Sequence, residues 1–259
     1  MTEVVIAGIG QIPVGEHYTL SLRSMGVQAL TRALKDSGGL KPDALYIGNL
    51  LSSMISHQSN LGALFTDYGR LDSIEAFTTE AAGASGAAAL RLGVLAILSG
   101  QADTVAVLGV EKWSDLVRAD AEAMITQELD YDYESIPGLT STSQAALIQQ
   151  RYLHEHDLEQ NALSGFALLA HANAVHNPFA FYRNPLTEEG YARAGMLSDP
   201  ITIFDGATYA DGAAALVLTR RELLPRGYAH PVISVMGSGA SSDALSWHDR
   251  TEPMSFTAA

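Results

Sequence analysis

The residues with the clearest chemical potential form a Gly-Ala-Ser-Gly turn at positions 83–86, where an apolar segment begins. The stretch Ala84–Leu98 carries Arg91 as its only charge, and a helix that is apolar all round is a buried one. The first N–H groups of a helix lack intrahelical partners, and the dipole makes that end positive. Such a helix start can polarise a carbonyl oxygen or hold an anion. The alternative is that its small residues only allow close packing.

Ser85 provides the hydroxyl nearest to this turn, whereas Gly83 has no side chain at all. A serine nucleophile needs a neighbouring base, and the sequence indicates none. Serine is also a preferred residue at helix starts. We therefore interpret Ser85 as a cap or packing residue, and a substitute nucleophile is the alternative.

Other polar residues have spacings that favour structural roles. His154 and His156 are two residues apart, which places them on different faces of a helix, unlike the i, i+4 pair of a zinc helix. Asp205 and Asp211 each precede a glycine, a pattern typical of turns. We predict no metal site.

Composition excludes several classes of protein. The formal net charge of −14 disfavours nucleic-acid binding, which needs a basic surface. The absence of cysteine removes disulfides and thiolate catalysis, and it is typical of a cytoplasmic protein. The start MTEVVIAGIG has no positively charged leader, so we expect no secretory signal. The apolar run is too short to span a membrane, which takes about 20 residues.

Hydrophobic patterns predict an α/β domain with a mainly parallel sheet and helices on both faces. The predicted strands are Val4–Ile9, Ala44–Ile47, Ile74–Glu80 and Thr104–Val110, and the predicted helices between them are Ser21–Asp36, Asn60–Tyr68 and the segment that begins at Ala84.

Between residues 114 and 199 the sequence predicts helices and no strong strand. The predicted helices are Ala119–Glu128, Ser143–His156 and Leu158–Val175, and the strands that follow are Ile201–Phe204, Ala213–Thr219 and Val232–Met236. We therefore predict a core domain from residues 1–113 and 200–259 that is interrupted by a helical insertion, 114–199.

Segments along the whole chain resemble the thiolase family. EAAGASGAAALRLGVLAILSG from Glu80 resembles the nucleophile segment, in which E-A-A-C-A-S-G opens the buried helix, but Gly83 stands where the family has its cysteine. GLTSTSQAALIQQRYLHEH from Gly138 and HANAVHNPFA from His171 resemble the loop domain of sterol-carrier type and archaeal acetoacetyl-CoA thiolases. The resemblance covers the N-terminal core domain and the loop domain, and the second thiolase core domain is expected to be absent.

The resemblance implies a thiolase-like αβα core domain with a helical loop-domain insertion. It also implies coenzyme A or acyl-CoA as substrate, without a covalently bound cofactor. By the same resemblance, Gly83 marks the vacant nucleophile position, and Gly138, Leu139, Thr140 and His171 lie near coenzyme A.

Two functional hypotheses follow from the resemblance. The first is the N-terminal half of an acyl-CoA acyltransferase of acyl-CoA and lipid metabolism, acting with a second thiolase domain, or a cysteine-less aldolase component. The second is an inactive scaffold or CoA-binding subunit. Thiolases are usually dimers, and some associate with OB-fold proteins. We therefore expect a homodimer, or a hetero-oligomer with a chain that carries the C-terminal thiolase domain, and the family's dimer contact falls on Ile74–Glu80.

Overall fold

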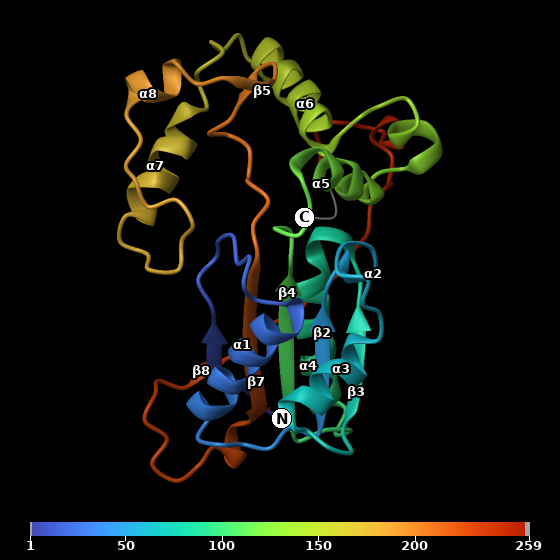
Figure 1. Cartoon of the computed structure of the whole chain (residues 1–259), viewed down its shortest axis with the longest axis vertical. Coiled ribbons are helices and arrows are strands. Elements are labelled where there is room, and N and C mark those ends of the chain that lie inside the picture. The colour runs from blue at the N-terminus through green and yellow to red at the C-terminus, as the bar shows by residue number, and fades with distance from the viewer. Residues whose placement is uncertain (1, 257–259) are drawn as a thin grey trace. The chain divides into compact units, whose positions relative to one another are not determined.

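The computed structural model describes residues 2–256, which form two compact units (Figure 1). The core unit comprises Met1–Asp115 and Ala210–Ala240, and the loop unit comprises Leu116–Tyr209 and Ser241–Ala259. The domains expected from the sequence differ from these units, because residues 200–209 and the C-terminal segment belong to the loop unit. Residues 1 and 257–259 of the expected core domain lie outside the described residues.

The core unit contains a six-stranded sheet of order β3-β2-β4-β7-β1-β8. Its strands are β1 Val4–Gln11, β2 Ala44–Gly48, β3 Glu75–Thr79, β4 Thr104–Glu111, β7 Gly212–Arg220 and β8 Ile233–Ser234.

The expectation of a mainly parallel sheet is wrong, because the sheet is mixed. β2 runs parallel to β3 and β4, whereas β7 is antiparallel to both β4 and β1, and β1 is antiparallel to β8. The chain leaves the core unit after β4 and returns at the same edge to begin β7, where Glu111 pairs with Gly212. Two strands that meet through such an excursion at one edge must run in opposite directions.

Helices cover both faces of this sheet, as predicted. α1 (Leu22–Asp36) and α3 (Leu61–Gly69) pack on one face and α4 (Ser85–Leu98) on the other. Alternate residues of β4 serve the two faces: Leu108 joins the cluster under α1 and α3, and Val107 joins the cluster under α4. A short helix, α2 (Ser52–Ile55), follows β2 and was not predicted.

The prediction that α4 is buried all round is wrong. Its inner face packs on the sheet through Ala89 and Ile97, but Leu95 and Leu98 on its outer side are 43% and 51% exposed. The uniform apolar character of the segment therefore gives the described core unit an apolar outer stripe.

The loop unit is largely helical. It contains α5 Arg118–Ile125, a π-helical turn Tyr131–Ser135, α6 Ser141–Glu155, α7 Ser164–Ala174, α8 Glu188–Ala192 and a two-stranded sheet of β5 Met196–Ser198 and β6 Ile201–Thr202.

Two sequence predictions for the loop unit are wrong. The helix expected over Leu158–Val175 begins only at Ser164, because Asp157 takes a left-handed backbone (φ 50°) and turns fill the following residues. The strand expected over Ile201–Phe204 shrinks to β6, which pairs with β5 and not with the core sheet.

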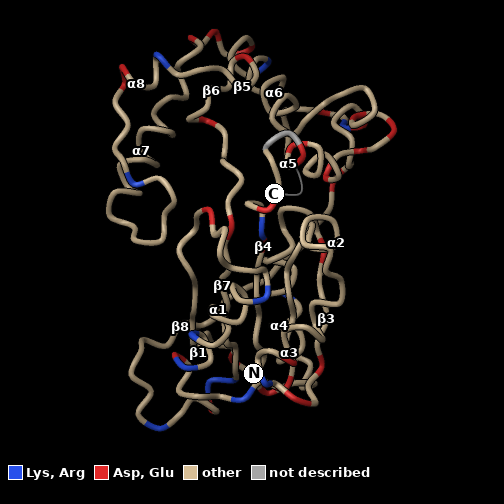
Figure 2. Tube along the Cα trace, viewed as in Figure 1, with Lys and Arg blue, Asp and Glu red and all other residues tan. Residues whose placement is uncertain are grey.

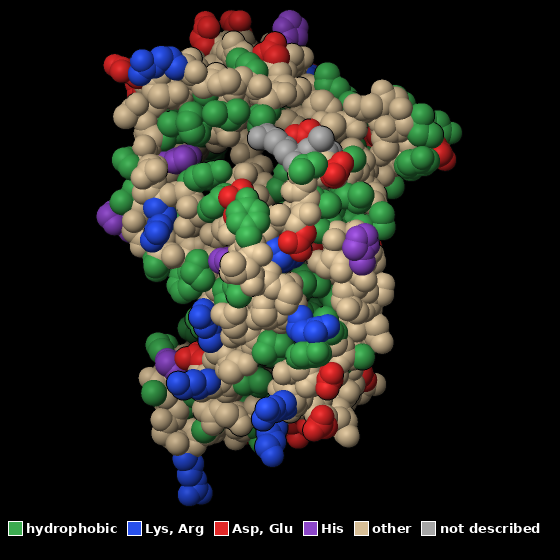
Figure 3. Space-filling model, viewed as in Figure 1, with side chains coloured by type: hydrophobic (Ala, Val, Ile, Leu, Met, Phe, Trp, Pro, Cys, Tyr) green, Lys and Arg blue, Asp and Glu red, His purple; other side chains and the backbone are tan. Residues whose placement is uncertain are grey.

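Charge and exposed apolar groups mark the surface of both units. Acidic residues are spread over the two units (Figure 2), consistent with the net charge of −14. Hydrophobic side chains gather among acidic ones on the segment between α5 and α6 (Figure 3), where Tyr131, Tyr133 and Ile136 are exposed. Among the helices of residues 2–256, none combines the length and apolarity that crossing a bilayer requires.

Candidate functional site

The predicted nucleophile turn lies at the carboxyl edge of the parallel strands, where ligands of α/β proteins commonly bind. The chain passes from β3 through a 3₁₀ turn, Ala82–Ala84, into α4. A Cβ added to Gly48, the last residue of β2, would lie 2.6 Å from the Cα of Gly86. The start of α4 therefore rests directly on the end of β2, and only a glycine there permits the contact.

Gly83 is exposed at this edge, and a Cβ built on it would meet no described atom within 4 Å. Ala82, just before it, has a left-handed φ of 45°. The N-cap residue of α4 is Ala84, and no described side chain caps the helix start. The position thus has room for a side chain or a ligand, next to a helix start whose N–H groups have no side-chain acceptor.

Ser85 braces the turn and does not cap α4. Its hydroxyl donates to the carbonyl of Ala82 at 2.7 Å and accepts the N–H of Ala81 at 3.0 Å. The side chain is buried, and both bonds join the first residue of α4 to the turn before it. Of the two alternatives, a cap or a packing residue, the structure supports packing, because α4 already begins at Ser85 and its N-cap residue is Ala84. No described base contacts the hydroxyl.

A half-buried acidic group that the sequence analysis did not single out lies at the same edge. Glu111, at the end of β4, accepts the N–H of Leu50 at 3.0 Å and the side-chain amide of Asn49 at 3.0 Å. Asn49 also donates to the carbonyl of Val110 at 2.7 Å. Burial raises the pKa of Glu111, although these hydrogen bonds oppose the shift. The only signal in the sequence was an acidic residue directly after a continuous apolar strand.

The remaining predicted site residues belong to the loop unit. Thr140 is the N-cap of α6 and forms a capping box with Ser143, while Gly138 takes a φ of 96° in the turn before it. Leu139, between them, is half-buried. These three residues shape the start of α6, and they do not line the cavity that contains His171.

His171 lines a cavity of about 640 Å³ within the loop unit. Its Nδ1 lies 3.0 Å from the carbonyl oxygen of Asn184, and its ring meets Phe204 edge-on at 5.6 Å between centroids. A carbonyl can only accept, so Nδ1 carries the proton and Nε2 of the neutral ring is left as an acceptor. Leu186, Leu197 and Ile203 add apolar walls.

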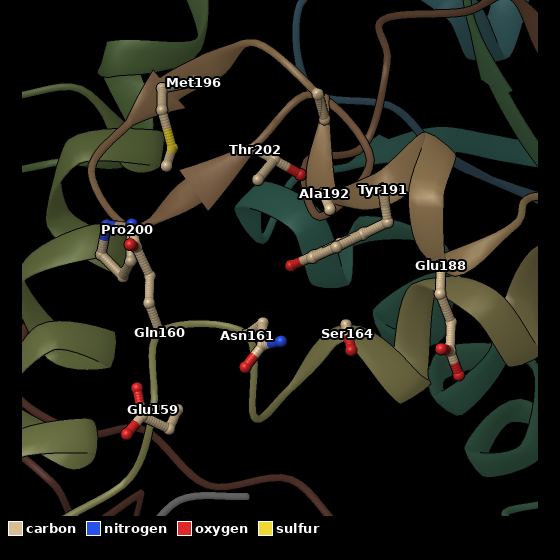
Figure 4. A pocket seen from close by; sticks show the side chains of 11 residues that line it. Glu159, Gln160, Asn161, Ser164, Glu188, Tyr191, Ala192, Met196, Pro200 and Thr202 are labelled. Atoms are coloured by element: carbon tan, nitrogen blue, oxygen red, sulfur yellow. The ribbon is translucent and has the colours of Figure 1, made fainter.

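A second cavity of about 520 Å³ lies among α7, α8 and the β5–β6 hairpin (Figure 4). The carboxylates of Glu159 and Glu188 are at its margin, and the hydroxyl of Tyr191 points into it (Figure 4). None of its described lining residues is Lys, Arg or His. The described lining of this cavity therefore offers no positive charge to an anionic ligand.

The two aspartates assigned to turns differ in the structure. Asp205 accepts the N–H and hydroxyl of Thr202, both at 2.8 Å, and the hydroxyl of Tyr191 at 2.9 Å, as expected of a turn residue. Asp211 is fully buried and pairs with Lys112 at 3.3 Å. The turn interpretation of Asp211 is therefore incomplete, because this residue is part of a buried ion pair.

The mixed sheet, its flanking helices and the helix start at its carboxyl edge define an α/β protein with a strand-edge site. The Thiolase, N-terminal domain, family model matches residues 4–184, and the chain belongs to the thiolase family. The chain contains no cysteine, which is consistent with the predicted replacement of the family's nucleophilic cysteine by Gly83.

Relatives and solved structures agree with this assignment. Acetyl-CoA acetyltransferases of Methanothermobacter thermautotrophicus and Methanocaldococcus jannaschii are 32% and 33% identical over 254 and 262 residues, which cover 97% and 100% of this chain and 66% of each relative. The chain thus spans about two thirds of the length of these relatives. A 17-hydroxy-3-oxo-4-pregnene-20-carboxyl-CoA lyase of Mycobacterium tuberculosis is 26% identical over 173 residues, 62% of this chain and 44% of the lyase.

Among solved structures, the Ltp2-ChsH2(DUF35) aldolase has a TM-score of 0.80 at 22% identity. The matched region covers 97% of this chain and 65% of the aldolase chain. The Acat5 thiolase from Ascaris suum, solved in complex with coenzyme A, has a TM-score of 0.68 at 20% identity. The matched region covers 91% of this chain and 70% of the thiolase chain. Both likenesses show the thiolase-like fold.

Proposed function

We propose that this chain binds a CoA thioester without forming an acyl-enzyme and supplies the helix-start half of a site for carbon–carbon bond cleavage or formation. The observation that carries the proposal is the empty space at Gly83 beside the uncapped start of α4. A covalent thiolase mechanism needs a thiolate, and the sequence has no cysteine.

The start of α4 can still act on a thioester by electrostatics. When a bond next to a thioester carbonyl breaks or forms, negative charge develops on the carbonyl oxygen. The N–H groups and positive dipole end of the first helical turn stabilise that charge and need no side chain at position 83. The accompanying proton transfers require an acid–base group, which we assign to a second thiolase domain.

The absence of cysteine supports aldol-type cleavage over thiolysis as the reaction class, and two of the likenesses fit it. A relative named as a CoA lyase and a structural neighbour named as an aldolase stand beside the acetyltransferases. In the loop unit, the His171 cavity offers apolar walls and a free Nε2 acceptor, which suits the amide-bearing pantetheine arm. We assign coenzyme A binding to this cavity and to the Gly138–Thr140 turn.

Isothermal titration calorimetry with acetyl-CoA tests the proposal, using the chain alone and with a C-terminal thiolase domain added. Gly83→Leu should lower the affinity at least tenfold, because leucine fills the space beside the helix start. Gly237→Leu is the matched control, since its Cβ also meets no described atom within 4 Å in the core unit. Equal affinities of the two variants would contradict the proposal.

The second candidate function is a scaffold or CoA-binding subunit that assembles with another chain. The apolar outer stripe of α4 and the exposed Phe77 on edge strand β3 favour it, since exposed apolar patches mark interaction sites. On this reading the partner is a second copy, a chain carrying the C-terminal thiolase domain, or an OB-fold protein. Acetyl-CoA binding that is unaffected by Gly83→Leu, together with a stable complex, would favour this function.

A further inference from the structure

A third cavity, of about 500 Å³, lies within the core unit. It is lined by the first residues of α1, by residues 55–58, by Leu64 of α3 and by Asp115. The first three of these β-strand connections follow β1, β2 and β4, which all run in the same direction. The cavity is therefore at the carboxyl edge of the sheet, where ligands of α/β proteins commonly bind. Gly83 is not among its described lining residues.

Two buried donors at this cavity lack a partner. The Nε of Arg23 and the Oγ of Ser56 are both buried, and neither forms a hydrogen bond within the described part of the chain. The guanidinium is held in place, because its Nη1 donates to the hydroxyl of Tyr68 at 2.8 Å and its Cζ lies 4.0 Å from the centre of that ring. Buried polar groups are rarely left unpaired in folded proteins, so these two donors point to a bound acceptor that completes the site.

The start of α1 adds two backbone donors. Ser21 caps the helix by accepting the N–H of Ser24 at 3.2 Å, whereas the N–H groups of Leu22 and Arg23 donate to no acceptor in residues 2–256. With 15 residues, α1 is long enough to give this end a positive dipole. Free N–H groups at such a helix start bind anions.

The charges around the cavity also favour an anion. Arg23 forms no ion pair with a described carboxylate, so its positive charge is not balanced by the protein. Asp115 is the single carboxylate among the described lining residues, and its Oδ1 lies 3.1 Å from the ammonium of Lys112. The negative charge of Asp115 is therefore offset by a neighbour, whereas the positive charge of Arg23 is left for a ligand.

We propose that the cavity at the start of α1 binds a phosphate group. The oxygen atoms of a phosphate can accept from the N–H groups of Leu22 and Arg23, from the Nε of Arg23 and from the hydroxyl of Ser56. Its negative charge is balanced by the guanidinium and by the dipole of α1. The site shares no described lining residue with the His171 cavity, and it does not depend on CoA binding.

Isothermal titration calorimetry with inorganic phosphate, at constant ionic strength, tests the site. Arg23→Gln should lower the phosphate affinity by about tenfold, because it removes a charged donor. Lys35→Gln is the matched control, since Lys35 is an exposed residue of the same helix and its loss changes the net charge equally. Ser56→Ala should lower the affinity by about fivefold. Its control is Ser53→Ala, which removes an exposed hydroxyl of α2.

Ser56→Ala also gives a readout of stability, which shows that the variant is folded. Without phosphate, the loss of an unpaired buried hydroxyl should leave the urea midpoint unchanged or raise it. With phosphate, the midpoint of the parent should rise, because the ligand binds the folded state, and the midpoint of Ser56→Ala should rise less. Equal gains in the two proteins would contradict a bond between Ser56 and the phosphate.

Two further titrations separate the source of the phosphate from the proposed function. Phosphate affinity that is unchanged in saturating acetyl-CoA indicates free phosphate or another phosphate ester, and competition indicates the phosphates of coenzyme A. Gly83→Leu should bind inorganic phosphate as the parent does, so the two sites can fail independently. No heat of binding with the parent, or equal phosphate affinities of Arg23→Gln and Lys35→Gln, would overturn the inference.

Discussion

The same substitution, glycine to alanine, should have opposite effects at two glycines of the site. A Cβ at Gly48 would lie 2.6 Å from the Cα and 2.7 Å from the N of Gly86, and backbone cannot move aside cheaply. Overpacking of this kind costs about 1–3 kcal/mol. A Cβ at Gly83 meets no described atom within 4 Å, and its φ lies outside the left-handed region. Alanine there should stabilise by about 0.4–1 kcal/mol, because it restricts the unfolded chain.

Urea unfolding measures both effects. With a slope of about 2 kcal/mol/M, a loss of about 2 kcal/mol lowers the midpoint by about 1 M. Trp113 belongs to the core unit and Trp247 to the loop unit, so a Trp247→Phe background reports the core unit by fluorescence. Gly48→Ala should unfold at lower urea than the parent chain, and Gly83→Ala at equal or higher urea. Equal midpoints for the two variants would refute the contact between β2 and the start of α4.

Four further predictions follow. The chain alone should not thiolyse acetoacetyl-CoA, and Gly83→Cys should not restore thiolysis without a second thiolase domain; turnover in a spectrophotometric assay by either protein alone would contradict this. Ser85→Ala should cost about 1 kcal/mol in urea unfolding, because two hydrogen bonds of the turn are lost, with little change in acetyl-CoA affinity. Burial raises the pKa of Glu111, so the folded state favours the protonated carboxyl. The contribution of Glu111 to the free energy of unfolding is therefore complete below its ordinary pKa of 4.5 and is lost as pH rises through the folded pKa. The stability of the parent relative to Glu111→Gln should fall as pH rises, and a constant difference would count against the burial effect. The chain should self-associate through apolar surface that includes the outer stripe of α4, and Leu95→Glu with Leu98→Glu should raise the monomer fraction in light scattering; an unchanged fraction would exclude that stripe.

Local patterns predicted most elements of the core unit, because their signals lie within each segment. The continuous apolar run at Thr104–Val110 became β4, and the periodic leucines after Ser21 became α1. Strand direction could not be predicted in this way. β7 runs antiparallel because the insertion returns the chain to the edge where β4 ends, and no local pattern of β7 encodes that excursion.

The polar groups of the site show the same limit. Asp211 looked like a turn residue because a glycine follows it, but its partners Ser114 and His17 lie 97 and 194 residues away in the sequence. The sequence pattern favours Ser85 as a helix cap, but its hydroxyl instead bonds to the backbone of the 3₁₀ turn. That turn depends on the left-handed backbone of Ala82, which the sequence pattern does not reveal. The family resemblance located Gly83, whereas the free space around it required the structure.

In the proposed function, the start of α4 holds a thioester carbonyl without a covalent bond. The most direct measurement is the carbonyl ¹³C resonance of acetyl-CoA labelled at that carbon, recorded with the parent chain, Gly83→Leu and Gly237→Leu. Hydrogen bonding at the helix start predicts a downfield shift with the parent and Gly237→Leu, no shift with Gly83→Leu, and no mass increase of the protein. The same shift in Gly83→Leu, or a protein mass increased by an acetyl group, would contradict the claim.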